Sequence, residues 1–204
     1  MTAVGCRFLT FVVIVAFTAA CTSSNGSPSP SPTPPTGSTS TSSTSPEPSE
    51  PLTTGPNVRP GEKPPEFPAL AKKHTANGAL AFAAYYYLAF DWGYATNDPY
   101  LVSRISAPRC EGCRKYINGL HSLDASGGVL HGGRVAILER GLRYGHFSYK
   151  SDYVARIVLD EQRIVIDRPR KPRRTIEPAV SRYVQYVFVS WRRGAWTVVE
   201  VASD

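Results

Sequence analysis

The sequence predicts an α+β fold: three N-terminal helices packed on a curved antiparallel sheet of about four to five strands, preceded by a disordered linker. Apolar residues recur at helical spacing as far as Leu123. From Val129 onward the sequence changes to stretches rich in Val, Ile, Tyr and Trp, which are typical of strands. Helices followed by a run of strands indicate an antiparallel sheet whose one face is covered by the helices.

Residues 1–20 have the organisation of a secretory signal peptide. Arg7 is followed by an apolar run from Phe8 to Ala20, and small residues come next. This run is shorter than the roughly 20 residues that a membrane-spanning helix needs. We therefore predict export and no permanent transmembrane segment.

The end of the apolar run, FTAAC, resembles the bacterial lipobox, although Thr18 stands where Leu is commonest. The resemblance implies that Cys21 is acylated and becomes the first residue of the mature chain. Two or more acyl chains anchor a protein stably, so we expect a lipid anchor on the extracytoplasmic face of the cell membrane. The alternative is that Cys21 is an ordinary residue beyond an ordinary cleavage site.

Residues 21–66 contain the predicted lipidated cysteine and a linker rich in Ser, Thr and Pro. The linker has too few apolar side chains to offset the entropy lost on ordering, so we predict a disordered spacer. Residues 67–204 then form one domain of ordinary size. The formal net charge of +7 is a moderate excess, and an exported protein rarely meets nucleic acid, so no nucleic-acid partner is predicted.

The first predicted helix is apolar on most sides and ends at residues 96–99, because the residue before Pro99 resists helical geometry. A short second helix covers residues 100–106. A third, amphipathic helix covers residues 110–126 and stops at the glycine pair 127–128.

Four strand segments follow the helices, and the glycine pairs 127–128 and 132–133 are interpreted as turn residues. The segment before the hairpin at Arg192, Arg193 and Gly194 is apolar on both faces, so we expect it in the middle of the sheet. The strand segments are residues 132–145, 152–166, 181–191 and 195–203.

The segment HTANGALAFAAYYYLAFDWGYATNDPYLVSRISAPRCEGC, residues 74–113, resembles an uncharacterised family of actinobacterial lipoproteins. The likeness extends over most of residues 64–203 and includes both glycine pairs. It implies a nuclear transport factor 2-like, or cystatin-like, fold, in which a curved sheet wraps around a long helix to form a cone. It implies no activity, because that fold hosts enzymes, binding modules and assembly domains alike.

Asp91 is the one catalytic candidate. If the cone forms, its cavity is the default ligand site, and Asp91 lies one turn from Tyr87 and Leu88 on an aromatic helix. A carboxylate with a raised pKa at that place would serve as a general base. The alternative is a local hydrogen-bonding role, because no His or second carboxylate shares this helix face. The sequence contains no metal or cofactor motif, so we predict neither a metal nor a cofactor.

The sequence RPRKPRR, residues 168–174, is the strongest charge feature. Such a cluster attracts anionic lipid headgroups or wall polymers, and the alternative is a solvated loop that limits aggregation. The residues expected to contact an anionic surface are Arg168, Arg170, Lys171, Arg173 and Arg174.

Cys110 and Cys113 have three interpretations: a redox pair, half of a zinc site, or a structural disulfide. Export places them in an oxidising compartment. Cleavage removes Cys6 and acylation occupies Cys21, so no further cysteine remains for zinc. A redox pair usually follows a strand, whereas this one follows a helix and Pro108. We therefore predict a disulfide that fixes the turn before the third helix.

These features together predict a non-enzymatic lipoprotein that binds an envelope protein or an apolar ligand in the cone cavity. The alternative is a cone-fold isomerase, dehydratase or hydrolase that uses Asp91. An open pocket in which Asp91 faces a second polar group would favour the enzyme.

Overall fold

The computed structural model describes residues 50–145, 147–177 and 182–203. The predicted signal peptide, Cys21 and the linker as far as residue 49 lie outside these residues. Within the described part of the chain, no helix is long and apolar enough to cross a membrane.

The helical part matches the three helices that the sequence predicts. The hydroxyl of Thr75 begins the first helix by accepting a hydrogen bond from the N–H of Gly78 at 3.1 Å. Asn97 ends it in the left-handed conformation, with φ at 60°. The helices are η1 (Ala69–Lys72, a 3-10 turn), α1 (Ala76–Thr96), α2 (Tyr100–Ile105) and α3 (Glu111–Ala125).

The strands form two antiparallel sheets, so the predicted single sheet of about four to five strands is wrong. A three-stranded sheet has the order β1-β4-β5, and a four-stranded sheet has the order β2-β3-β6-β7. The strand β6 lies between β3 and β7, in the middle of the larger sheet. The strands are β1 (Val129–Gly132), β2 (Val135–Arg143), β3 (Tyr153–Glu161), β4 (Ile164–Asp167), β5 (Arg174–Ile176), β6 (Arg182–Arg192) and β7 (Ala195–Ser203).

The two sheets meet at a corner where β1 leads into β2 and β3 leads into β4. Gly132 and Gly133 have φ values of 76° and 67°, which bend the chain in a way that favours glycine. A Cβ on Gly132 would lie 2.2 Å from the carbonyl oxygen of Arg163. The N–H of Gly133 donates to that carbonyl at 3.0 Å, and the N–H of Gln162 donates to the carbonyl of Arg134 at 2.9 Å. The single curved sheet of the expected cone is therefore replaced by two sheets that share this corner.

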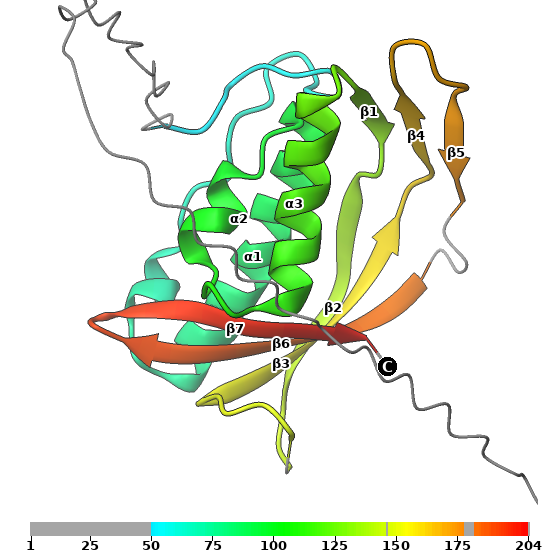
Figure 1. Cartoon of the computed structure of the whole chain (residues 1–204). Helices are drawn as coiled ribbons and strands as arrows, with labels where there is room; N and C mark the ends of the chain where they lie inside the picture. The colour runs from blue at the N-terminus through cyan, green and yellow to red at the C-terminus, as the bar shows by residue number, and fades with distance from the viewer. Residues whose placement is uncertain (1–49, 146, 178–181, 204) are drawn as a thin grey trace, which may run out of the picture. The chain divides into compact units, whose positions relative to one another are not determined.

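The main core lies between α1 and one face of the larger sheet (Figure 1). Phe82 and Tyr86 from α1 pack with Ile157 of β3, Val189 of β6 and Val198 of β7, and all five side chains are buried. Burial of one such apolar side chain contributes about 1.5–3 kcal/mol. This packing explains why α1 is apolar on most sides, since strands and other helices cover it.

The segment before η1 is packed against α1. The indole N–H of Trp92 donates to the carbonyl of Leu52 at 3.0 Å. The side-chain amide of Asn57 donates to the carbonyls of Tyr94 at 2.8 Å and Leu130 at 2.9 Å. The packed part of the chain therefore begins no later than Leu52, which lies inside the predicted linker of residues 21–66.

Candidate ligand-binding site

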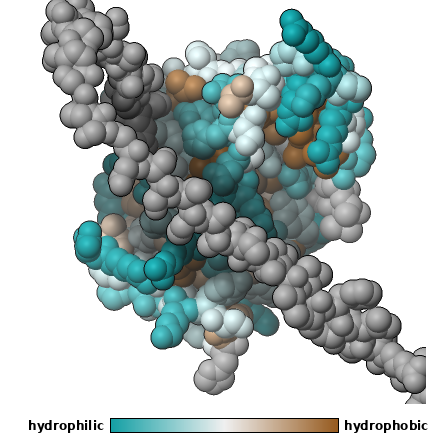
Figure 2. All heavy atoms as spheres, viewed as in Figure 1, coloured by the Kyte–Doolittle hydropathy of each residue, from teal (hydrophilic) through white to brown (hydrophobic). Residues whose placement is uncertain are grey.

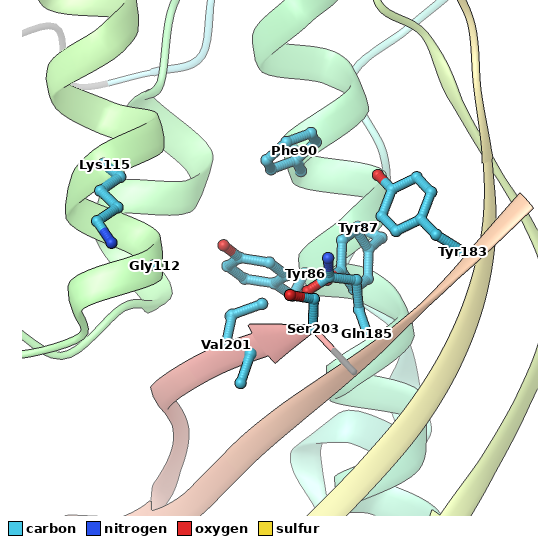
Figure 3. A pocket seen from close by; sticks show the side chains of 10 residues that line it. Tyr86, Tyr87, Phe90, Gly112, Lys115, Tyr183, Gln185, Val201 and Ser203 are labelled. Atoms are coloured by element: carbon cyan, nitrogen blue, oxygen red, sulfur yellow. The ribbon is translucent and has the colours of Figure 1, made fainter. Parts of the chain in front are cut away.

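A cavity of about 450 Å³ lies between α1, α3 and the ends of β6 and β7 (Figure 3). We call it the tyrosine cavity, because three tyrosines contribute to its wall. It has the size and the mixed apolar and polar wall of a small-molecule site. The lining residues are Tyr86, Tyr87, Phe90, Gly112, Lys115, Tyr183, Gln185, Val201, Ala202 and Ser203.

Helical and strand periodicity together bring these side chains into one place. Tyr86 and Phe90 are four residues apart on α1 and therefore lie on one helix face. Tyr183 and Gln185 alternate along β6 and therefore point to the same side of the sheet. In Figure 3 the hydroxyl of Tyr86 points towards the α3 side of the cavity, and the side chain of Gln185 lies beside Ser203.

The tyrosine hydroxyls are the distinctive polar groups of this cavity. The hydroxyl of Tyr87 is buried and has no hydrogen-bond partner among the described residues, which is uncommon because buried polar atoms are usually paired. Burial raises the pKa of both Tyr86 and Tyr87 above the usual value near 10. Both hydroxyls therefore keep their protons at neutral pH, and the hydroxyl of Tyr86, which points across the cavity, can donate a hydrogen bond to a ligand.

Glu161, at the end of β3, is a carboxyl beside this site that the sequence analysis does not single out. Burial raises its pKa, and a hydrogen bond from Tyr183 acts in the opposite direction. Tyr183 lines the tyrosine cavity, whereas Glu161 is not among the residues of its wall. Sequence gives no signal for Glu161, because an acidic residue at the end of a strand is ordinary.

Asp91 lies at the corner between the sheets and does not line the tyrosine cavity. Its Oδ1 accepts hydrogen bonds from Arg134 Nε at 2.8 Å and from the N–H of Val135 at 2.7 Å. Its Oδ2 accepts from Arg134 Nη2 at 2.6 Å. Asp91 does face a smaller cavity of about 150 Å³, and both of its oxygens accept hydrogen bonds from the protein itself.

Cys110 and Cys113 form the predicted disulfide, and both residues are fully buried. Cys110 caps α3, because its Sγ accepts a hydrogen bond from the N–H of Cys113 at 3.1 Å. The carboxylate of Glu200 accepts from the N–H groups of Glu111 at 3.0 Å and Gly112 at 2.9 Å. A buried carboxylate at a helix N-terminus is stabilised by the free N–H groups and the helix dipole. The sequence does not indicate this role of Glu200, which comes from the far end of the chain.

Residues 168–173 of the basic sequence connect β4 to β5, and Arg174 begins β5; none of them lines the tyrosine cavity. Arg173 pairs with Asp167 at 2.6 Å, and Arg168 donates to the hydroxyl of Ser126 at 3.3 Å. The predicted contact residues Arg170, Lys171 and Arg174 are exposed. Within the described ranges, no group of three or more His, Cys, Asp or Glu residues is placed to hold a metal ion.

The chain was compared with protein families, curated proteins and solved structures. A family model described as a family of unknown function (DUF6318) matches residues 59–202. No curated protein matches the chain. Among solved structures, the intermembrane space region of the chloroplast protein ARC6 matches with a TM-score of 0.42 and 9% sequence identity. That match covers 64% of this chain and 97% of the other, and so low a score supports no conclusion on fold or function.

Proposed function

Because this chain belongs to DUF6318, a family of unknown function, we propose that it is a membrane-anchored extracytoplasmic binding module that holds a small ligand in the tyrosine cavity. One observation carries the proposal: a cavity of about 450 Å³ brings the hydroxyl of Tyr86 together with the polar side chains of Gln185 and Ser203 (Figure 3). Polar groups placed in this way around an apolar surface can fix the orientation of a bound ligand.

The wall composition indicates the class of ligand. Tyr86, Phe90 and Val201 provide aromatic and apolar surface, while Gln185 and Ser203 provide hydrogen-bonding groups. One water-sized group occupies about 30 Å³, so the cavity has room for a ligand of roughly 15 non-hydrogen atoms. The ligand that fits best is a compact molecule with an apolar or aromatic body and oxygen acceptors.

Binding has more support than catalysis. The enzyme hypothesis depends on Asp91 as a general base, but this carboxylate is held in an ion pair with Arg134 and does not line the tyrosine cavity. A general base needs a free lone pair within reach of the substrate proton. The tyrosine cavity offers hydroxyl and amide groups that orient a ligand.

The cavity is tested with the neutral aromatic probe N-phenyl-1-naphthylamine, whose fluorescence rises in apolar sites. Ser203→Trp places a large ring at the exposed end of β7 and is expected to weaken probe binding at least fivefold. Ser203→Ala is the matched control and is expected to bind like the parent chain. Equal probe affinity in all three proteins would overturn the site.

The membrane anchor is supported by the signal peptide and the lipobox sequence that ends at Cys21. Metabolic labelling with a fatty-acid probe tests it. The parent chain is expected to carry label and to sediment with membranes, and Cys21→Ala is expected to lose the label. Equal labelling of the two chains would refute lipidation at this residue.

A further inference from the structure

A second cavity, which we call the α3 groove, lies between α3 and the smaller sheet and has a volume of about 230 Å³. Figure 2 shows apolar residues bordered by hydrophilic ones in the region of β4 and β5. The apolar wall consists of Leu120, Leu123, Leu130, Ile164, Ile166 and Ile176. Gly119 leaves one side of the groove without a side chain, and a Cβ at this position would meet no atom within 4 Å.

An aromatic wall separates the α3 groove from the tyrosine cavity. The rings of Phe90 and Tyr116 stack with centroids 4.0 Å apart, and the hydroxyl of Tyr116 donates to the carbonyl of Phe90 at 2.7 Å. Phe90 lines the tyrosine cavity, whereas Tyr116 and Tyr94 line the α3 groove. The two cavities therefore have separate aromatic walls, and Lys115 lies at the edge of both.

Positive charge borders the apolar wall. Lys115 and Arg168 both line the groove. Lys115 is paired with Glu111 at 2.9 Å, but the described contacts of the Arg168 side chain include no carboxylate, only the hydroxyl of Ser126. Exposed Arg170 and Lys171 follow Arg168 after Pro169 on the β4–β5 connection. An apolar groove that ends at an arginine without a carboxylate partner is complementary to an apolar chain with an anionic head.

We propose that the α3 groove binds a medium-chain fatty acid, with the acyl chain along the Leu and Ile wall and the carboxylate at Arg168. One water-sized group, such as a methylene, occupies about 30 Å³, so the groove has room for roughly eight such groups. One short acyl chain fits this space, and the two chains of a membrane lipid do not. The arginine fork suits a carboxylate, with which it forms paired hydrogen bonds. This site goes beyond the ligand proposed for the tyrosine cavity and does not depend on it.

Photocrosslinking of the full chain in membranes tests the proposal, with octanoate that carries a diazirine on its chain. The probe is expected to label peptides from α3 and from β4, and excess octanoate is expected to compete. Arg168→Gln is expected to reduce labelling at least fivefold, whereas Arg193→Gln, on the distant β6–β7 hairpin, is expected to leave it unchanged. Competition by octanamide as strong as by octanoate would show that the charge is not recognised and would overturn the proposal.

Gly119→Phe blocks the groove without breaking the fold, because the position is open and a helix tolerates Phe better than Gly. It is expected to abolish octanoate labelling, and Gly119→Ala is the control that keeps it. Binding of N-phenyl-1-naphthylamine is expected to stay unchanged in both, which separates this site from the tyrosine cavity. Labelling by a photoactivatable phosphatidylglycerol in vesicles, with none by the octanoate probe, would replace the fatty acid with a membrane lipid and overturn the proposal.

Discussion

Asp91 on α1 and Arg134 at the corner between the sheets form a two-pronged ion pair, in which Arg134 Nε donates to Oδ1 at 2.8 Å and Nη2 donates to Oδ2 at 2.6 Å. Glu62 accepts two further hydrogen bonds from the same guanidinium. Only 11% of the Arg134 side chain is exposed, so its charge depends on these partners. The cluster joins the segment before α1, the middle of α1 and the first residues of β2.

Asp91→Asn is expected to destabilise the fold. The substitution keeps the shape of the side chain but removes its charge, and it leaves the largely buried Arg134 side chain with one carboxylate in place of two. Because Glu62 still pairs with Arg134, we expect a loss of about 1.5–3 kcal/mol, the range for hydrogen bonds to charged groups, which urea denaturation would measure. Asp124→Asn, at an exposed position of α3, is the control and should change the unfolding free energy little. An unchanged stability in Asp91→Asn would refute the structural role and reopen the catalytic hypothesis.

Acid is expected to weaken this cluster through Glu62. The hydrogen bond from Arg134 lowers the pKa of the Glu62 carboxyl from 4.5 to about 2. In the range between these values the unfolded chain binds the proton more tightly, so Glu62 stabilises the fold above pH 4.5, and this contribution is lost as the pH falls towards 2. Because the side chain is 23% exposed, solvent screening limits the effect to about 1 kcal/mol.

Glu62→Gln removes the titrating group and is expected to flatten the dependence of the unfolding free energy on pH below 4.5. Glu66→Gln, an exposed neighbour, should keep the slope of the parent chain. Parallel pH curves for Glu62→Gln and the parent chain would contradict the assignment.

The helices could be predicted from the sequence because their signals are local. Pro99 and the glycine pair 127–128 stand directly beside the helix ends that they cause. The division into two sheets could not be predicted in this way. Gly132 and Gly133 look like residues at the start of a strand, and they form a corner only because the carbonyl of Arg163, from a distant part of the chain, lies against them.

The tyrosine cavity depends on the same kind of long-range arrangement. Each tyrosine of α1 fits the pattern of a core residue, and nothing in the local sequence distinguishes Tyr87, whose hydroxyl has no described partner, from Tyr85. Asp91 is conspicuous in the sequence as a lone acid on an aromatic helix. Its partner Arg134 lies in a predicted strand segment far along the chain and carries no local signal. The ion pair that accounts for an acid at position 91 is therefore known only from the fold.

The Cys110–Cys113 disulfide is expected to act as a structural bond. Closing so short a loop contributes about 2 kcal/mol by loop entropy, and both cysteines are fully buried. The native protein is therefore expected to resist alkylation until it is unfolded and reduced, and Cys110→Ser with Cys113→Ser to unfold at lower urea concentration than the parent chain. Mass spectrometry after alkylation is the measurement. Two thiols that react in the native exported protein would contradict a structural disulfide and favour the redox interpretation.

Substitution by alanine is expected to have opposite effects on stability at Gly132, in the corner between the sheets, and at Gly141, further along in β2. Gly132→Ala forces a Cβ onto a residue with φ at 76° and brings it within 2.2 Å of the Arg163 carbonyl oxygen, so we expect a loss of about 2 kcal/mol or more in the free energy of unfolding. Gly141→Ala, within β2, meets no atom within 4 Å, so stability is expected to stay equal or to rise slightly, because alanine restricts the unfolded chain more than glycine does. Denaturation of the two variants beside the parent chain measures both effects. If Gly132→Ala proved as stable as Gly141→Ala, the corner would not require glycine, and the reason given for two sheets would fail.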